Sequence, residues 1–222
     1  MNVQSHVIFC DFDGTVARRD IGYHLFRRFT DGQCDTLVAD WKSGSLSTRD
    51  CLRQEATWFH GKPDDVYAFL DDFDLNPGFT EFTRRAEQNG IPLYILSDGL
   101  DLYIDFLLSK HGVGHLPRIC NHATLIDSGL RLEFPYPDPH NTGGGVCKGE
   151  RIAEYRQRQN GPITVIFVGD GLSDVDALPH SDLLFAKKDL ARYCDRHNIP
   201  YTSFDTFHDV TRECVTRSLF PM

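Results

Sequence analysis

The most constraining feature of this sequence is an apolar run near its start that ends abruptly at two carboxylates. Residues Val7–Cys10 are strand formers with no polar residue among them, which is typical of a strand buried on both faces of a parallel sheet. Asp11 and Asp13 follow directly, with Gly14 after them. Because ligands bind at the carboxyl ends of strands in open α/β sheets, we expect Asp11 and Asp13 to lie where chemistry takes place.

The close spacing of Asp11 and Asp13 indicates a cation. Neighbouring carboxylates resist ionising together unless a positive charge lies between them. A hard cation such as Mg²⁺ prefers carboxylate oxygens as ligands. A solvated turn explains the two aspartates equally well when they are considered alone, so the rest of the chain has to decide.

Apolar runs and helical periodicity alternate along most of the chain. Residues 92–96 and 163–168 predict two more buried strands, and residues 118–126, 130–134 and 183–186 predict shorter ones. Helical patterns lie between the strands, and a last one covers Val210 to Phe220. This alternation predicts an α/β fold with a Rossmann-like parallel sheet.

The segment between the first two strands has a different pattern. Four amphipathic stretches with short links follow one another, and glycines at 32, 44 and 61 end the first three. We interpret residues 18–75 as a small four-helix-bundle cap. It is inserted into a catalytic core formed by residues 1–17 and 76–222.

Polar residues follow the other predicted strands and the glycine-rich loop as well. They are Ser97, Asp98 and Gly99 after the second strand, Lys148 after the loop, and Asp170 and Asp174 after the strand at 163–168. Together with the first motif, these residues suit the transfer of a phosphoryl group. A carboxylate such as Asp11 can attack phosphorus and form an aspartyl-phosphate. Asp13 can protonate the leaving alkoxide and later take a proton from water.

The remaining residues have matching tasks in the same reaction. The hydroxyl of Ser97 and nearby backbone N–H groups can hold phosphate oxygens. Lys148 can neutralise charge on the nucleophile and on the phosphoryl group. Mg²⁺ held by Asp11, Asp170 and a backbone carbonyl can supply the rest of the positive charge.

The motifs DFDGTV, SDG and GDGLSD, in this order and with Lys148 before the last, resemble the haloacid dehalogenase-like phosphatase superfamily along the whole chain. The resemblance implies Asp11 as the nucleophile and Asp13 as the acid/base, with the carbonyl of Asp13 on the metal. It further implies that Ser97, Asp98, Gly99 and Lys148 bind the phosphate and that Asp170 binds Mg²⁺. Asp174 would bind the metal directly or through a water.

The helical insertion directly after the first motif resembles the cap of the phosphoserine-phosphatase-like branch. That branch has an acidic residue facing the substrate where this chain has Asp20, which is also suited to cap the helix that starts at Ile21. The branch has an arginine on its third cap helix that clamps the substrate carboxylate, and Glu55 falls at that place here. Residues 185–210 resemble bacterial phosphatases of methionine salvage. We therefore expect a neutral, hydroxylated or carbonyl-bearing phosphate ester rather than phosphoserine.

Several other functions share part of this pattern. A phosphomutase would keep Asp13, so it is the nearest alternative within the superfamily, together with phosphoserine phosphatase. A dehalogenase has no need of Asp13, and a cation pump needs long membrane segments. A dinucleotide site fails because Asp174 stands where the third glycine of its motif belongs. A phosphate-sensing module without activity is disfavoured by the complete set of carboxylates and Lys148.

Charge and composition limit the partners. A formal charge of −9 argues against a nucleic-acid surface or an anionic membrane and leaves a small phosphorylated metabolite as the expected partner. No apolar run nears 18 residues and no basic-then-apolar leader is present, so a soluble, cytoplasmic protein is expected. Seven scattered cysteines suit a reducing compartment. The separations of Cys120, His122, His140 and Cys147 match no recurrent zinc spacing. The sequence does not predict the oligomeric state.

Overall fold

A computed structural model of the chain describes residues 5–127, 129–136 and 143–220. Its centre is a seven-stranded sheet in the order β4-β3-β2-β1-β5-β6-β7. The neighbouring strands pair in parallel, apart from β4, which runs antiparallel to β3. The strands are β1 (Ser5–Cys10), β2 (Leu93–Leu100), β3 (Arg118–Ile126), β4 (Gly129–Glu133), β5 (Ile163–Gly169), β6 (Leu183–Ala186) and β7 (Thr202–Ser203). The predicted α/β class and largely parallel sheet are confirmed.

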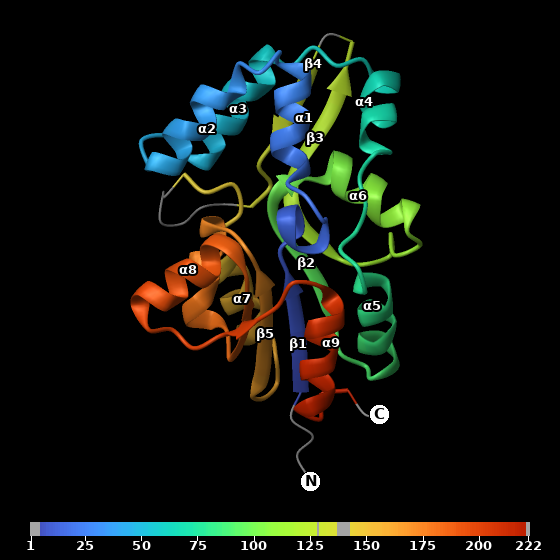
Figure 1. Cartoon of the computed structure of the whole chain (residues 1–222), viewed down its shortest axis with the longest axis vertical. Coiled ribbons are helices and arrows are strands. Elements are labelled where there is room, and N and C mark those ends of the chain that lie inside the picture. Colours follow the sequence, from blue (N-terminus) through green and yellow to red (C-terminus); the bar gives the residue numbers. More distant parts are fainter. Residues whose placement is uncertain (1–4, 128, 137–142, 221–222) are drawn as a thin grey trace.

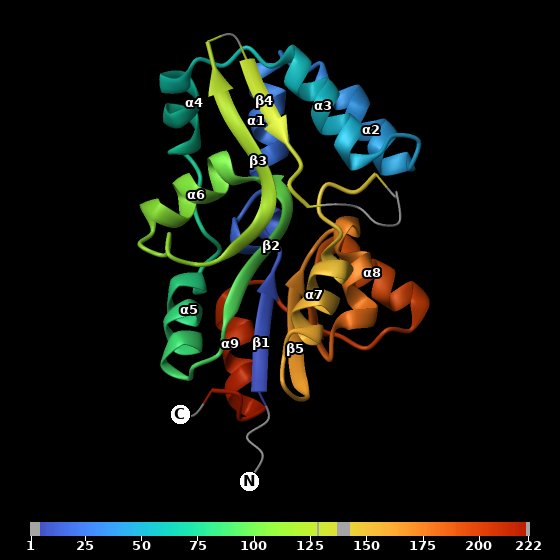
Figure 2. The ribbon, with the colours of Figure 1, turned by 180° about the vertical axis from the view of Figure 1, so that it is seen from behind.

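Helices cover both faces of this sheet and one of its ends. Figure 1 and Figure 2 show α5 and α9 on one face, α7 and α8 on the other, and α1 to α4 beyond the carboxyl ends of the central strands. Among the described helices, none combines the length and the apolar character that crossing a bilayer requires. The helices are α1 (Ile21–Phe29), α2 (Cys34–Ser43), α3 (Thr48–Trp58), α4 (Pro63–Leu70), α5 (Phe79–Gln88), α6 (Asp101–Lys110), α7 (Lys148–Gln157), α8 (Lys188–His197) and α9 (Phe207–Thr216).

The burial of strand β1 on both faces explains why its sequence is apolar without interruption. Val7 and Phe9 pack in the cluster that includes α7 and α8, whereas Ile8 and Cys10 pack in the cluster that includes α5, α6 and α9. All four side chains are fully buried. Successive side chains of a strand point to opposite faces, so a strand covered by helices on both sides needs apolar residues at every position.

The four helices predicted between residues 18 and 75 are present. Helix α1 contacts α2, α3 and α4, so the four helices pack together. Asp20 accepts a hydrogen bond from the N–H of Tyr23 at 2.8 Å, and Ser47 accepts one from the N–H of Asp50 at 3.1 Å. These side chains satisfy N–H groups that the first turn of a helix leaves unpaired, which explains why α1 and α3 begin where they do.

The chain enters and leaves these helices at one place. Ala17 and Leu75 form an isolated antiparallel bridge, and the N–H of Asn76 donates to the carbonyl of Val16 at 2.8 Å. The two crossing segments are therefore held against each other. This pairing lies at the junction expected from the sequence, and the division into a core and a cap stays a prediction.

The hairpin of β3 and β4 extends further from the sheet than the sequence suggests. Figure 2 shows it reaching up among the four helices, and β4 packs against α3. Arg49 of α3 also donates to the carbonyls of Gly144 and Tyr136, at 2.7 Å in each case. Residues assigned to the predicted core thus contact the helical insertion directly, which a linear pattern of residues cannot indicate.

Two predicted elements differ from the structure by several residues. The second strand was expected to end at Leu96, but β2 continues to Leu100 and its pairing with β3 is irregular between these residues. Ser97, Asp98 and Gly99 therefore stand within the end of the strand, at a bulge that re-aims side chains. The last helix starts at Phe207 rather than Val210, because Thr206 and Asp209 form a capping box ahead of it.

Candidate active site

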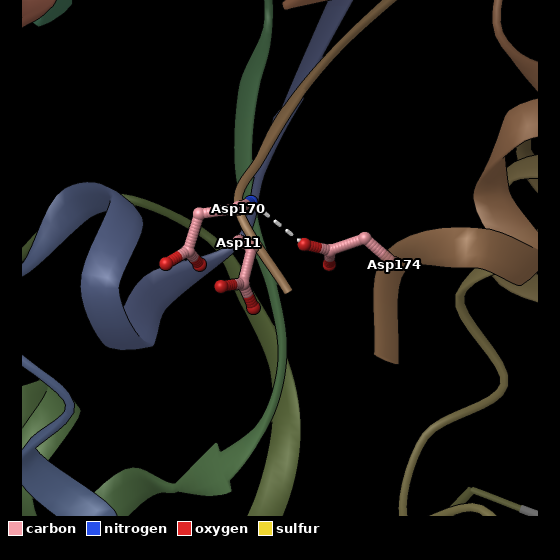
Figure 3. Close-up of side chains that lie close together, drawn as sticks. All are labelled: Asp11, Asp170 and Asp174. Carbon is pink, nitrogen blue, oxygen red and sulfur yellow. Dashed lines mark hydrogen bonds between the residues drawn. The ribbon is translucent and has the colours of Figure 1, made fainter. Parts of the chain in front are cut away.

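The sheet register brings the predicted residues to one edge. Cys10 at the end of β1 pairs with Val168 of β5 on one side and with Ile95 of β2 on the other. The residues that follow each strand are therefore neighbours. The carboxylates of Asp11 and Asp170 lie close together with Asp174 opposite them (Figure 3), and one oxygen from each lies within 4.8 Å of the others.

Lys148, the first residue of α7, contacts two of these carboxylates. Its side chain is fully buried, and its Nζ donates to Asp11 Oδ1 at 2.6 Å and to Asp174 Oδ1. Burial alone acts to lower the pKa of Lys148, but the carboxylates of Asp11 and Asp174 raise it well above its usual value. The lysine therefore stays charged and holds the nucleophile candidate in place.

Asp174 is engaged through both of its oxygens. Oδ1 accepts from Lys148, and Oδ2 accepts from the N–H groups of Asp170 and Gly171 at 2.9 Å each. The second contact ties the 3₁₀ segment Leu172–His180 to the end of β5. Asp174 thus caps a helical turn, as an aspartate after a strand often does, and it also positions Lys148.

Asp170 is held between a hydroxyl and a second lysine. Its Oδ1 accepts from Thr15 Oγ1 at 3.0 Å, and its Oδ2 accepts from Lys188 Nζ at 2.7 Å. Gly14 lies directly beside it with φ of +75°, and a Cβ at this position would lie 2.4 Å from Asp170 Oδ2. Only glycine suits the turn after β1, because both its conformation and the close carboxylate exclude a side chain.

Asp13 has hydrogen-bond partners of its own, apart from the other three carboxylates. Its Oδ1 accepts from the N–H groups of Ile21 (2.6 Å) and Gly22 (3.2 Å) at the start of α1, and its Oδ2 accepts from the hydroxyl of Tyr103 at 2.6 Å. Burial, with a contribution from the nearby Asp20, raises the pKa of Asp13 to about 7, against the effect of these hydrogen bonds. A carboxyl with this pKa can both give and take a proton near neutral pH.

Within the SDG segment, Ser97 belongs to the candidate site, whereas the hydrogen bonds of Asp98 stabilise the neighbouring loop. Ser97 is buried, and its Oγ accepts from the N–H of Gly99 at 3.0 Å. The side chain of Asp98 accepts from the N–H of Val146, while its carbonyl accepts from Asn121 Nδ2 at 2.6 Å. Burial raises the pKa of Asp98 to about 6. Asp98 thus ties β2 to the loop before α7, and its expected contact with phosphate stays a prediction.

Two further carboxyls lie in the helical insertion. Asp20 is exposed and caps α1, which is compatible with the substrate-facing position that the resemblance implies. Glu55 of α3 is only 4% exposed and lies beside the thiol of Cys51. Burial, together with the negative charge of Asp20, raises the pKa of Glu55 to about 8. At neutral pH the carboxyl of Glu55 is therefore mostly uncharged.

The sheet-edge group fits a divalent cation. Asp11, Asp170 and Asp174 are buried and offer only oxygen atoms, which are the ligands that Mg²⁺ prefers. Burial raises the pKa of Asp11 well above its usual range, opposed by Lys148 and increased by Asp174 and Asp170. Lys148 and Lys188 together compensate two charges of the three, so a further cation is needed to balance the third.

Within the part of the chain that the structure describes, no other group suits a zinc ion. Over the described ranges, the three aspartates are the one group of His, Cys, Asp or Glu side chains close enough together to hold a metal ion. Cys120, His122 and Cys147 are not drawn together in this way. His140 lies outside the described residues, as does most of the loop that precedes Gly143.

Three residues of the site were not assigned from the sequence. Thr15 belongs to the first motif but was given no task. Tyr103 was counted only as an apolar position of a helix, although a buried tyrosine hydroxyl needs a partner and so signals a polar contact. Lys188 follows the strand at 183–186, and a basic residue just beyond a parallel strand could have indicated a place at the same edge.

Comparisons with known proteins identify the family of this chain. A family model described as haloacid dehalogenase-like hydrolase matches residues 8–179. A 2-hydroxy-3-keto-5-methylthiopentenyl-1-phosphate phosphatase from Bacillus cytotoxicus is 30% identical over 216 residues, covering 93% of this chain and 94% of the relative. The enzyme of the same name from Lysinibacillus sphaericus is 30% identical, covering 91% of each chain.

The fold agrees as well. A solved phosphoserine phosphatase, described as a phospho-aspartyl intermediate analogue, matches with a TM-score of 0.71 at 17% identity. The match covers 95% of this chain and 99% of that one. At this identity the likeness concerns the fold alone. Family match, relatives and fold lead to the same conclusion: the chain belongs to the haloacid dehalogenase-like hydrolase family.

Proposed function

We propose that this hydrolase is a Mg²⁺-dependent phosphatase that cleaves a small phosphate monoester through an aspartyl-phosphate on Asp11. One observation carries the proposal. The Nζ of Lys148 lies 2.6 Å from Asp11 Oδ1, at the carboxyl end of β1 and beside two more buried carboxylates. A carboxylate kept in place by a buried cation, at the edge of the sheet where ligands bind, is suited to attack a phosphoryl group.

In the first half of the reaction, an oxygen of Asp11 attacks the phosphorus atom of the ester. The bond from phosphorus to Asp11 forms while the bond to the ester oxygen breaks, and the carboxyl of Asp13 gives its proton to the departing alkoxide. The pKa of about 7 that burial gives Asp13 suits this donation. Lys148 stays charged throughout and balances the charge that gathers on the phosphoryl oxygens.

In the second half, water attacks the phosphorus atom of the aspartyl-phosphate. The carboxylate of Asp13 accepts the proton of this water, and the bond from phosphorus to Asp11 breaks. Inorganic phosphate leaves, Asp11 regains its negative charge, and Asp13 again carries a proton. The enzyme therefore returns to its starting state with one water consumed for each ester cleaved.

We further propose which residues hold Mg²⁺. Asp11, Asp170 and the backbone carbonyl of Asp13 would bind it, and Asp174 would bind directly or through a water. When bound, the ion would supply positive charge that stabilises the phosphoryl group during transfer. Ser97 would hold a phosphate oxygen.

The helical insertion supports a substrate without a carboxylate. Glu55 is buried and mostly neutral at pH 7, and Asp20 beside it adds negative charge. This pair offers hydrogen bonds to a hydroxyl or carbonyl group but no cation for a carboxylate. The relatives from Bacillus cytotoxicus and Lysinibacillus sphaericus are named for 2-hydroxy-3-keto-5-methylthiopentenyl 1-phosphate. We propose this diketo or enol type of phosphate ester as the substrate.

The test is a comparison of kcat/KM for the 2-hydroxy-3-keto-5-methylthiopentenyl ester, sugar phosphates and phosphoserine, each with Mg²⁺. The diketo or enol ester should rank first and phosphoserine low. Phosphoserine in first place would overturn the substrate assignment. Transfer of phosphate to a second sugar rather than to water would favour a phosphomutase. No turnover of p-nitrophenyl phosphate at any Mg²⁺ concentration would contradict the phosphatase itself.

The Glu55→Arg variant tests the part played by the insertion. A guanidinium at this position would provide the fork that a carboxylate fits. Phosphoserine turnover should then rise relative to the neutral esters, and an unchanged ranking would remove Glu55 from the substrate contacts.

The cytoplasmic location and the expectation of no nucleic-acid or membrane partner stay predictions from composition and charge.

A further inference from the structure

The side chain of Tyr103 reaches the proposed acid/base from a neighbouring helix. Tyr103 lies in the first turns of α6, is 2% exposed, and donates from its hydroxyl to Asp13 Oδ2 at 2.6 Å. A tyrosine buried this far requires a partner for its hydroxyl. Here the partner is the carboxyl oxygen of a group that exchanges protons, not a backbone carbonyl.

The surrounding backbone leaves space for this contact at two glycines. A Cβ on Gly99 of β2 would lie 2.3 Å from the Tyr103 hydroxyl and 2.7 Å from Asp13 Oδ2. A Cβ on Gly22 of α1 would lie 3.0 Å from the same hydroxyl. Any larger residue at position 99 would displace the pair, so the approach of Tyr103 to Asp13 depends on the absence of a side chain there.

The two oxygens of Asp13 differ in their partners. Oδ1 faces the N–H groups of Ile21 and Gly22, which can only donate, so a proton on this oxygen would find no acceptor there and would compete with both donors for the lone pairs of the oxygen. Oδ2 faces a hydroxyl, which can donate to a carboxylate or accept from a carboxylic acid. The proton that Asp13 transfers therefore resides on Oδ2, and Tyr103 keeps its hydrogen bond in both states.

Asp13 Oδ2 and the phosphate-binding candidate Ser97 both lie close to Gly99. The Cβ position built on Gly99 lies 2.7 Å from Asp13 Oδ2 and 3.0 Å from Ser97 Oγ. These two atoms therefore flank the same spot on β2. An ester whose phosphate is held by Ser97 would therefore lie close to Oδ2.

We propose that Tyr103 is a positioning residue that holds Oδ2 of Asp13 toward the ester oxygen. This inference rests on the proposed phosphatase function and on the acid/base part of Asp13. Tyr103 acts through Asp13 and does not touch the substrate. Without its hydroxyl, the carboxyl of Asp13 turns about the anchor of Oδ1, and protonation of the alkoxide becomes slower.

The experiment compares two leaving groups in the Tyr103→Phe variant. kcat/KM reports the step in which the alcohol leaves. An alkyl phosphate needs a proton on its leaving oxygen, whereas p-nitrophenolate leaves without one. We expect kcat/KM to fall about 10- to 100-fold for the alkyl ester, within the range of general acid–base help, and to stay nearly unchanged for p-nitrophenyl phosphate. Damage to the fold would lower both values alike.

Two further variants complete the design. Asp13→Asn should show the same contrast between leaving groups, and adding Tyr103→Phe to it should cause little further loss, because the two residues act as one unit. Tyr155→Phe is the matched control, since it removes the hydroxyl of a tyrosine that contacts Tyr94 on the opposite face of the sheet. This variant should leave kcat/KM unchanged for both substrates.

The outcomes distinguish a failure of the positioning role of Tyr103 from a failure of the proposed function. If Asp13→Asn discriminates between the leaving groups and Tyr103→Phe does not, the positioning role of Tyr103 is wrong and the proposed function stands. An equal loss for both substrates in Tyr103→Phe would likewise overturn the inference. If Asp13→Asn itself shows no contrast, the acid/base assignment fails, and the inference fails with it.

Discussion

The edge of the sheet and the helical insertion both bury carboxyl groups, but they neutralise them differently. Asp11 and Asp174 share the buried ammonium group of Lys148. Glu55 lies beside a thiol and the acidic Asp20, and burial raises its pKa to about 8, so it keeps its proton. A buried carboxyl must be paired or protonated. The sheet edge thus keeps its buried carboxylates next to a cation, whereas the buried carboxyl of the insertion keeps its proton.

The largest effect should come from Asp11→Asn, which removes a charged carboxylate from the sheet edge. We expect kcat to fall on the order of 10⁴-fold or more, since an amide is neither a nucleophile nor an anionic ligand. The measurement is turnover of p-nitrophenyl phosphate with Mg²⁺. Asp64→Asn, which alters an exposed carboxylate of α4, serves as the control. Retention of most of the activity would exclude the covalent mechanism.

Asp13→Asn should have the next largest effect. The expected loss in kcat is about 10²–10⁴-fold, with KM little changed, because both half-reactions lose their acid or base. The amide oxygen can still accept from the N–H groups of Ile21 and Gly22, so the fold should be retained. Steady-state kinetics on an alkyl phosphate checks this. A loss of only a few fold would mean that another group moves the proton.

Asp170→Asn should chiefly weaken the binding of Mg²⁺. The variant keeps the hydrogen bond from Thr15 but loses a negative charge at the proposed metal site. We expect the Mg²⁺ concentration for half-maximal activity to rise about 10- to 100-fold, with kcat largely recovered at saturation. The shift of the melting temperature with Mg²⁺ gives a second, independent readout. If the metal dependence were the same as in the wild type, Asp170 would not be a ligand.

The last expected effect is on stability rather than activity, and it concerns the neutral carboxyl of the insertion. Glutamate has an ordinary pKa of 4.5, and Glu55 has one of about 8 in the folded protein, so the folded state binds more protons between these values. The stabilisation is complete below pH 4.5 and is lost as the pH rises toward 8, by at most about 1.4 kcal/mol per pH unit.

The Glu55→Gln variant tests whether Glu55 causes the stability to fall as the pH rises. The free energy of unfolding, measured by denaturant at several values between pH 5 and pH 8, should fall more steeply with pH in the wild type than in the variant. Glutamine keeps the size of the side chain and cannot ionise, so the difference between the two curves isolates Glu55. Parallel curves would show that Glu55 ionises normally, and the contrast between the two regions would disappear.

The sequence by itself determined the α/β fold, the family and the residues that gather at the sheet edge. Apolar runs that end at Asp11, Ser97 and Asp170 were enough, since parallel strands must bring their carboxyl ends to one edge. The enzyme class predicted from these motifs, a phosphoric monoester hydrolase, is confirmed by the family and its relatives.

Only the tertiary structure decided the hydrogen-bond partners and the pKa values of these groups. Tyr103 is one more residue on the buried face of a helix until β2 and α1 place its hydroxyl on Asp13. Glu55 is an ordinary acidic residue in the sequence, and its pKa rises because α3 packs it away from water. Such contacts depend on distances between segments far apart in the chain, whereas a motif or a periodicity reports only neighbours along it.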